Sequence, residues 1–561
     1  MPMQKEYSGI FVSNFNLQNY INILENDSES PEIRTIQAPY GQVLNVLLDN
    51  KENNNYDFGF LWVQPQAVID SFNKLINGQL IPTSVIINEV DEFCRAVINF
   101  SKTLKFLFVA SWNMPYYNRG WGILDLKNNL GISNNLMRMN LRLSDNFNDF
   151  KNIFILDSQK WVDAAGKDAY NSKLWFLSKI PFDNIVFKQA MRELKSAIKT
   201  ISGESKKIII LDLDNTLWGG IVGDVGWENL RLGGHDFIGE SFVEFQLGLK
   251  ALKNRGIILA VVSKNEESVA LEAISKHPEM VLKKEDFVGW EINWDDKSKN
   301  IQNLLKKINL GPQAAVFLDD NPVERARVRE SLPEICVPEL PQNVMEYTKA
   351  LNQLNCFDVI NPTKEDLERT NLYLADNERQ KLKTELNSLE DWLKSLKTIV
   401  TIEELNNQNI QRAAQLFNKT NQMNLTTRRL GESELIQWAN QNNHKLWTIR
   451  VSDKFSDSGL TGIISLEIEN KTALIADFLL SCRVMGRKIE EVMLINVINY
   501  SINNGIEKII AKFSHTPKNK PCFDFWKEKS GFFFIQEENS FVWDFLSPFP
   551  EITQIEIKNN Y

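Results

Sequence analysis

Runs of apolar residues alternate with longer mixed stretches in the first third of the chain, up to about residue 185. An unbroken apolar run of four to eight residues is typical of a strand that is buried on both faces. The stretches between the runs are long enough for helices, so the pattern predicts a parallel sheet covered by helices. The predicted strands are FGFLWV (58–63), SVIINEV (84–90), KFLFVAS (105–111) and NIFILD (152–157).

The same alternation is clearer between about residues 190 and 345. Strand–helix–strand spacing of this kind predicts a second doubly wound parallel sheet. We expect strands at 206–214, 256–263 and 314–320, and helices at 266–275 and 298–308. The segment LPEICVPELPQ (332–342), with three prolines, is predicted to be the linker that leaves this region.

The last part of the chain has a different pattern, because apolar segments follow one another there without helices between them. Adjacent strands of this kind favour an α+β fold with some antiparallel sheet. After a charged, helical stretch, we expect strands at 445–452, 461–469, 472–481 and 507–513, and a helix at 486–502. The sequence therefore predicts an α/β protein of three domains, two doubly wound parallel-sheet domains at residues 1–188 and 189–345 and an α+β domain at residues 346–561.

Composition narrows the function only slightly. The chain has 561 residues, of which 43% are hydrophobic, and this length suits several folded domains. Its net charge of -9 argues against nucleic acid as the main partner. The five cysteines are widely spaced, which indicates free thiols in a reducing compartment. Without a signal peptide or an apolar run of membrane-spanning length in the sequence, we expect a cytoplasmic protein.

Two carboxylates stand at the end of the first strand of the middle region, in Asp212-Leu213-Asp214-Asn215-Thr216. Ligands bind at the carboxyl ends of strands in open parallel sheets. At such an exit the two side chains can converge on one point. Asp212 could then attack phosphorus as a covalent nucleophile, while Asp214 protonates the leaving group and later deprotonates water.

Two further strand ends and one helix start carry matching chemistry. Ser263 offers a hydroxyl to a phosphoryl oxygen, and Asp319 and Asp320 offer the hard oxygen ligands that Mg²⁺ prefers. Lys297, at a predicted helix start, could offset the crowded negative charge. A solvated turn would explain the first motif alone, but four such elements in this order favour a phosphoryl-transfer site.

These four elements resemble the signature motifs of the haloacid dehalogenase (HAD) superfamily. The resemblance implies that Asp212 is the nucleophile and Asp214 the acid/base. It also implies a phosphate site and a Mg²⁺ site. The phosphate group would comprise Thr216, Ser263 and Lys297, and the metal ligands would be Asp212, the Asp214 carbonyl, Asp319 and Asp320.

Longer segments resemble one family within that superfamily, the FkbH-like proteins of subfamily IIIC. The resemblance rests on LDLDNTLWGGIVGD (211–224), HPEMVL (277–282), NWDDKSKNI (293–301), FLDDNPVERARVR (317–329), KTNQMNLTTRR (419–429), SCRVMGRKIEEVML (481–494) and SHTPKNKPCFDFW (514–526). The N-terminal region is similar, more loosely, to the SGNH-hydrolase-type domain that often precedes FkbH-like domains. It contains no histidine, so we expect it to act as a scaffold and not as a Ser–His hydrolase.

The resemblance implies transfer of a glyceryl unit from 1,3-bisphosphoglycerate, or a similar donor, to the thiol of an acyl carrier protein in polyketide-type biosynthesis. One site would remove phosphate and another would carry a thioester. Two alternatives stay open: a HAD phosphatase or phosphotransferase acting on a small soluble phosphometabolite, and a non-catalytic scaffold. The intact set of Asp212, Asp214, Lys297 and Asp319 argues against the scaffold.

The last region resembles an acyltransferase of the GNAT fold. That fold holds a pantetheine pyrophosphate at R/Q-x-x-G-x-G/A, between a strand and a helix start. Here Arg483, Gly486 and Arg487 match the motif, but the last position is Lys488. The start of the helix that follows and the two arginines would favour the thiolate form of Cys482, which could then relay an acyl group. A packing role at a strand end is the alternative for this cysteine.

Some relatives carry a cysteine directly before the Ser-Lys-Asn of the second HAD motif, where this chain has Val262. A relay through that position is therefore closed to this chain. Two polar clusters in the last region could also face a phosphate or a pantetheine arm, or lie on solvated surface. They comprise Gln411, Lys419, Asn421, Gln422 and Asn424, and Thr516, Lys518 and Asn519.

Overall fold

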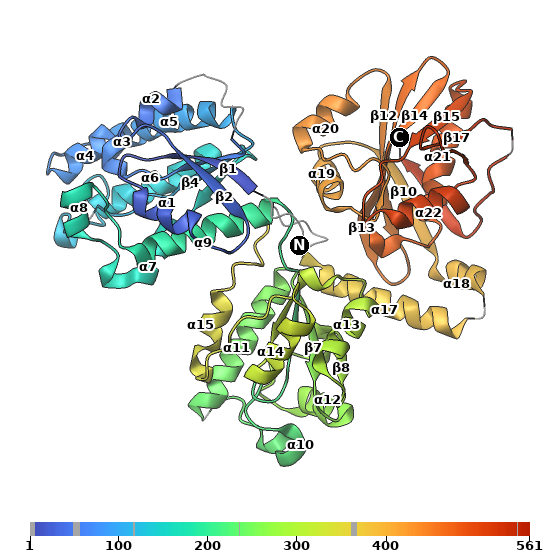
Figure 1. Ribbon diagram of the computed structural model, residues 1–561, viewed down its shortest axis with the longest axis horizontal. Helices are drawn as coiled ribbons and strands as arrows, with labels where there is room; N and C mark the ends of the chain where they lie inside the picture. The colour runs from blue at the N-terminus through green and yellow to red at the C-terminus, as the bar shows by residue number, and fades with distance from the viewer. Residues whose placement is uncertain are drawn as a thin grey trace. The chain divides into compact units, whose positions relative to one another are not determined.

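The computed structural model describes residues 6–48, 56–115, 118–234, 236–360, 367–386, 388–546 and 548–560. By its contacts the chain divides into two compact units, Met1–Ser202 and Gly203–Tyr561 (Figure 1). The second unit contains two separate sheets, which we call the central region (203–360) and the C-terminal region (367–560). None of the described helices is long and apolar enough to cross a membrane.

A parallel sheet forms the middle of the first unit, with the strand order β2-β1-β3-β4-β5. Apolar side chains on its two faces make two separate cores. The strands are β1 (Glu6–Val12), β2 (Glu32–Gln37), β3 (Phe58–Leu61), β4 (Phe106–Ala110) and β5 (Ile153–Leu156). The helices are α1 (Gln18–Glu25), α2 (Val43–Leu48), α3 (Pro65–Val68), α4 (Asp70–Ile76), α5 (Thr83–Ser101), α6 (Ile132–Phe147), α7 (Ser158–Ala165), α8 (Ser172–Ser178) and α9 (Asn184–Ile201).

The predicted parallel sheet is confirmed, but one of its predicted strands is wrong. Residues 84–90 lie at the start of helix α5. The buried residues Ile86, Val90, Phe93 and Val97 recur every three or four positions, which is the spacing of one helix face. A window of seven residues was too short to show this period, and strands β1 and β2 were missed.

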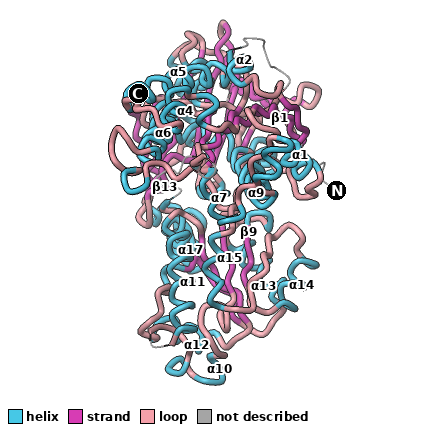
Figure 2. The backbone as a smooth tube through the Cα atoms, turned by 90° about the vertical axis from the view of Figure 1, so that its left-hand side faces the viewer, coloured by secondary structure: helices cyan, strands magenta, loops and turns pink. Residues whose placement is uncertain are grey.

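The central region holds a second parallel sheet, with the order β8-β7-β6-β9. Figure 2 shows these strands in magenta with helices on both sides. The strands are β6 (Ile208–Leu211), β7 (Ile258–Ser263), β8 (Phe287–Ile292) and β9 (Ala315–Leu318). The helices are α10 (Val222–Val225), α11 (Phe237–Asn254), α12 (Glu267–Lys276), α13 (Lys297–Lys307), α14 (Pro322–Ser331) and α15 (Tyr347–Asn352). The predicted doubly wound sheet is confirmed, with β8 as an additional strand.

The proline-rich segment 332–342 is more ordered than a linker. Cys336 pairs with Val316 of β9, and the side chains of Ile335 and Leu340 are buried. Helix α15 follows and packs against α11. Of its three prolines only Pro333 lies in a turn, and the apolar residues of the segment belong to the core of the central region.

The C-terminal region is built on a mixed sheet, with the path β16-β17-β15-β14-β13-β12-β10-β18 and β11 beside β14. The pairs β14–β15 and β10–β18 are parallel and the others antiparallel. The strands are β10 (Thr398–Glu404), β11 (Met423–Asn424), β12 (His444–Ser452), β13 (Asp457–Glu469), β14 (Thr472–Leu480), β15 (Lys508–Lys512), β16 (Phe533–Ile535), β17 (Ser540–Trp543) and β18 (Ile555–Asn560). The helices are α19 (Ile410–Lys419), α20 (Glu432–Ala439), α21 (Ile489–Asn503) and α22 (Lys520–Glu528). The antiparallel content predicted for this part is confirmed.

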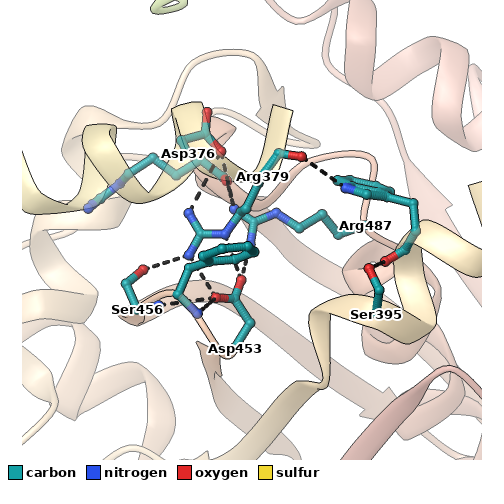
Figure 3. Close-up of polar contacts among 9 residues, drawn as sticks. Asp376, Arg379, Ser395, Asp453, Ser456 and Arg487 are labelled. Carbon is teal, nitrogen blue, oxygen red and sulfur yellow. Dashed lines mark hydrogen bonds and ion pairs between the residues drawn. The ribbon is translucent and has the colours of Figure 1, made fainter. Parts of the chain in front are cut away.

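The charged stretch before this sheet forms helices α17 (Arg369–Glu385) and α18 (Leu389–Leu396). Arg379 of α17 is almost fully buried, and its guanidinium makes two hydrogen bonds to Asp453, of 2.7 and 2.9 Å (Figure 3). The guanidinium of Arg487 reaches the same carboxylate at 2.9 Å. Because a buried charge without a partner is costly, this cluster fixes α17 against the loop that precedes α21.

Candidate functional site

Four of the predicted site residues come together at the carboxyl edge of the central sheet. Strand β6 lies between β7 and β9, and Leu211 pairs with both Val261 and Leu318. The next residues along β6 and β9, Asp212 and Asp319, therefore leave the sheet side by side. The backbone N–H of Asp212 also donates to the carbonyl of Leu318 at 3.0 Å.

Lys297 joins the two carboxylates. It is the first residue of α13, which is capped by the Asp296 side chain, and it is only 4% exposed. Its Nζ lies 2.9 Å from Asp212 Oδ1 and 2.6 Å from Asp319 Oδ2. Burial disfavours the charged ammonium, but the charges of Asp212 and Asp319 outweigh burial and raise the pKa of Lys297.

Three carboxylates crowd around this single lysine. Oxygen atoms of Asp212, Asp319 and Asp320 lie within 4.8 Å of one another. Burial, followed by the charge of Asp212, raises the pKa of Asp319 to about 6 and also raises that of Asp320. A surplus of negative charge on hard oxygen atoms fits a divalent cation such as Mg²⁺.

Asp214 is held in a different way, by three donors. Its Oδ1 accepts from Trp218 Nε1 at 2.8 Å and from the Val222 N–H at 3.1 Å. Its Oδ2 accepts from Asn265 Nδ2 at 2.8 Å. Burial nevertheless raises its pKa, although these hydrogen bonds oppose the shift. A fixed carboxyl with a raised pKa suits a group that gives and takes a proton.

The structure places the remaining predicted residues of this site as follows. Thr216 accepts from the Asp320 N–H at 3.1 Å and donates to Asp320 Oδ1 at 3.3 Å, so it orients a carboxylate. Ser263 is buried at the end of β7, where its carbonyl accepts from the Asn293 N–H at 3.2 Å. Thr216, predicted to bind phosphate, therefore contacts the predicted metal ligand Asp320.

Sequence reasoning missed three residues that support the site. Trp218 and Asn265 hold Asp214, as described above. Arg325, on the first turns of α14, donates from Nη1 to the carbonyls of Asp319 and Asp320, each at 2.7 Å. Its own charge is matched by Glu339. Asn265 and Arg325 lie in motifs already singled out, but hydrogen bonding to a backbone carbonyl leaves no sequence signature of its own.

The loop predicted to hold a pantetheine phosphate lies between β14 and α21. Cys482 is exposed there, and Arg483 is partly exposed. Gly486 has a φ of +73°, and its N–H donates to Glu490 Oε1 at 2.9 Å. The guanidinium of Arg487 is turned inward to Asp453, with Asp376 at 3.7 Å. Arg483 and Arg487 therefore do not converge on one exposed point in this structure.

Glu490 fills the position that a bound anion would take at the start of α21. It is 4% exposed, and its Oε2 has no hydrogen-bond partner among the described residues. Burial raises the pKa of this carboxyl to about 7. A helix start that already binds a carboxylate has one donor fewer for an outside phosphate.

The two predicted polar clusters of the C-terminal region meet at one hydrogen bond. Asn519 Nδ2 donates to the carbonyl of Asn424 at 3.0 Å, and both side chains are fully buried. This bond ties strand β11 to the loop before α22. The other members lie at or near the surface around it, namely Gln411, Lys419, Asn421, Gln422, Thr516 and Lys518.

Polar residues that follow two strands of the first unit form hydrogen bonds with one another. Ser158 Oγ donates to Asn113 Oδ1 at 2.8 Å and to the carbonyl of Ser111 at 2.6 Å. With no histidine in the sequence before His235, these serines have no imidazole base within the unit.

Comparison with known proteins places the chain by structure only. No protein-family model and no curated protein matches it. The N-terminal part of protein BF1531 from Bacteroides fragilis, which contains a phosphatase domain complexed with Mg, matches with a TM-score of 0.58 and 29% sequence identity. The match covers 64% of this chain and 95% of that one. The chain thus shares the fold of that protein over 64% of its length.

Two acetyltransferase structures match a smaller part of the chain. The PaiA N-acetyltransferase from Thermoplasma acidophilum, in complex with coenzyme A, has 15% identity and a TM-score of 0.20, and the match covers 26% of this chain and 96% of that one. The ribosomal-protein-S18-alanine N-acetyltransferase from Escherichia coli has 8% identity and a TM-score of 0.20, with 26% and 91% covered. These scores are too low to assign a shared fold.

The carboxylate cluster predicts a measurable response to Mg²⁺. Adding Mg²⁺ to metal-free protein should raise the midpoint of thermal unfolding, because a ligand that binds the folded state stabilises it. Asp319→Asn should lose most of that shift, since it removes one charged ligand. Asp295→Asn, at an exposed carboxylate paired with Lys299, is the control and should respond like the wild type. An undiminished shift in Asp319→Asn would contradict the assignment.

The buried Glu490 predicts a pH-dependent stability. An unfolded glutamate titrates near 4.5, whereas the folded pKa is raised to about 7. Between these values the folded protein keeps a proton that the unfolded chain has lost, so its free energy of unfolding falls as pH rises. Glu490→Gln should therefore be more stable than the wild type above pH 7, by up to about 3 kcal/mol, and this gain should shrink toward pH 5.

Urea unfolding from pH 5 to pH 8 would measure this difference. The exposed Glu469→Gln serves as the control variant and should follow the wild type at every pH. A gain for Glu490→Gln that does not change with pH would show that the carboxyl is not the cause.

Proposed function

We propose that the central region is a Mg²⁺-dependent phosphatase or phosphotransferase of the HAD type, with Asp212 as its nucleophile. The observation that carries the proposal is the buried Asp212–Lys297–Asp319 triad, in which a third carboxylate, Asp320, lies beside the same single lysine. The fold shared with the phosphatase-containing part of BF1531, which binds Mg, supports it.

The residues can be assigned to two balanced steps. In the first, a carboxylate oxygen of Asp212 bonds to phosphorus while the bond to the leaving oxygen breaks, and Asp214 gives that oxygen its proton. In the second, Asp214 takes a proton from water, the water oxygen bonds to phosphorus, and Asp212 is released with inorganic phosphate as the product. Trp218 and Asn265 keep Asp214 in place throughout.

The metal would be held by Asp212, Asp319 and Asp320, with the Asp214 carbonyl as a further ligand suggested by the family resemblance. When bound, Mg²⁺ neutralises phosphoryl and carboxylate oxygens and so lets an anionic nucleophile approach an anionic phosphate. Lys297 adds one positive charge beside Asp212 and Asp319, and Ser263 would offer a hydroxyl to a phosphoryl oxygen.

We extend the proposal to glyceryl transfer, from a donor such as 1,3-bisphosphoglycerate to an acyl carrier protein. The exposed thiol of Cys482 supports a relay. Tyr373 of α17 packs against the core of the central region, and burial raises its pKa, with a smaller electrostatic contribution from Cys482. Cys482 is therefore near a residue that the phosphatase core positions.

The relay needs no oxidant and no further energy source. The thiolate of Cys482 would attack the carbonyl carbon of the acyl phosphate, and phosphate would leave with the electron pair of the broken C–O bond. The carrier thiolate would then attack the thioester, and Cys482 would leave as the thiolate. Thioester exchange is nearly isoenergetic, so the acyl group can pass on.

One observation favours the alternative, a phosphatase that acts on a soluble phosphometabolite. The Gly486 N–H is taken by Glu490 and the Arg487 guanidinium by Asp453, so the loop offers few groups to a pantetheine phosphate. In that case the C-terminal region would serve binding alone. Dependence on a carrier protein separates the two functions.

Replacing the nucleophile tests the phosphatase proposal. Asp212→Asn should lower phosphate release from p-nitrophenyl phosphate by several orders of magnitude, because an amide cannot form the phosphoryl-enzyme. Asp224→Asn, at an exposed carboxylate on α10, should keep wild-type activity and serves as the control. Circular dichroism would confirm that both variants are folded. Comparable turnover by Asp212→Asn would end the proposal.

Replacing the thiol tests the relay. Cys482→Ser should keep phosphate-ester cleavage at Asp212 but fail to load a carrier protein from 1,3-bisphosphoglycerate, as measured by intact-mass spectrometry. Without a carrier, the wild type should carry one acyl adduct on the Cys482 peptide. Cys336→Ser is the matched control and should load normally. Normal loading by Cys482→Ser would show that this residue only packs.

A further inference from the structure

A cavity of about 500 Å³ lies directly beside the carboxylate site. Asp320 and Asn215 line the cavity on the side of the site, so the cavity reaches the edge of the carboxylate group formed by Asp212, Asp319 and Asp320. Other parts of its lining come from the start of α11 and from residues 340–347, which include the end of the proline-rich segment. Their apolar members are Ile238, Phe242, Leu340, Pro341, Val344 and Tyr347.

Two arginines line the cavity, and each already pairs with a carboxylate of the protein. Arg231 makes two hydrogen bonds to Asp236, of 2.7 and 2.8 Å. Asp236 is itself fixed, because it caps α11. The guanidinium of Arg325 is divided between Glu339 and the carbonyls of Asp319 and Asp320.

The other polar groups of the wall are uncharged. Tyr347 donates to the Asn215 carbonyl at 3.3 Å, and Asn215 Oδ1 accepts from the Gly220 N–H at 3.0 Å. Gln342 is exposed at the surface, and its neutral amide is part of the lining. Among the described lining residues, an anion in this cavity would meet no cation that lacks a partner, and burying an unpaired charge is costly.

We infer that this cavity receives the organic part of the phosphate ester, and that it selects phosphomonoesters whose organic part is uncharged and partly apolar. The inference rests on the proposed phosphatase function and names its substrate class. A carboxyl group on the substrate would be accepted as an ester or thioester and disfavoured as a free acid. Simple phosphorylated sugar acids would be poor substrates for the same reason.

Three small phosphate esters of similar size test this selectivity in the full-length wild-type protein with Mg²⁺. They are sn-glycerol 3-phosphate, 3-phosphoglycerate and the methyl ester of 3-phosphoglycerate. We expect kcat/KM, measured as phosphate released, to be at least about tenfold lower for the free acid than for the other two, which corresponds to about 1.4 kcal/mol. Equal values for the acid and its methyl ester would overturn the inference.

A charge-gain variant tests whether the cavity is the cause. Gln342→Arg adds an unmatched cation to the lining and should raise the ratio of kcat/KM for 3-phosphoglycerate over glycerol 3-phosphate several-fold. Gln353→Arg is the matched control, since it adds the same charge at an exposed residue of the α15 terminus outside the cavity. An unchanged ratio in Gln342→Arg, or an equal rise in both variants, would show that the organic part binds elsewhere.

p-Nitrophenyl phosphate separates failure of this inference from failure of the proposed function. If the wild type hydrolyses it and Asp212→Asn does not, the phosphatase proposal stands, and the three esters decide the substrate class alone. If the wild type hydrolyses none of the four phosphates, both proposals fall together.

Discussion

The central region depends on one electrostatic constraint, the confinement of three carboxylates around a single buried ammonium. Asp212, Asp319 and Asp320 lie together because β6 and β9 are neighbours in a parallel sheet, and Lys297 stands between two of them. One lysine cannot balance three acids in a buried site. Burial and the charge of Asp212 together raise the pKa of Asp319. The negative charge that Lys297 does not balance leaves a cation as the natural complement of the site.

The residues of this site were predictable because each stands in a motif directly after an apolar run or at a helix start. Strand ends of a parallel sheet meet at one edge, so placing Asp212 and Asp319 on two strands was enough to predict their contact. Arg325 was missed because it bonds to backbone carbonyls. Trp218 and Asn265 were missed because their shared partner, Asp214, lies 4 and 51 positions away in the sequence. Such contacts follow from the path of the chain, which composition and spacing do not specify.

The errors in the fold have a similar origin. Residues 84–90 were predicted to be a strand because a short apolar run does not reveal the period of its buried positions. Only the continuation through Phe93 and Val97 shows the spacing of a helix. Strand β8 was missed because three of its six residues are half-exposed and interrupt the apolar pattern. The proline-rich segment was predicted to leave the central region, yet its apolar side chains fill the core beneath β9.

The two candidate sites differ in whether their charged groups are balanced by partners within the protein. In the C-terminal loop, Arg487 meets Asp453, and Glu490 takes the Gly486 N–H, so the groups that could bind a phosphate are bound within the protein. At Asp212 the opposite holds, because three acids lie beside one buried lysine, whose single positive charge cannot balance them. A folded chain tolerates such an uncompensated charge only where a ligand completes it. That difference makes the edge of the central sheet the stronger candidate for chemistry, and it leaves the exposed Cys482 as the main group in the C-terminal loop still available to react.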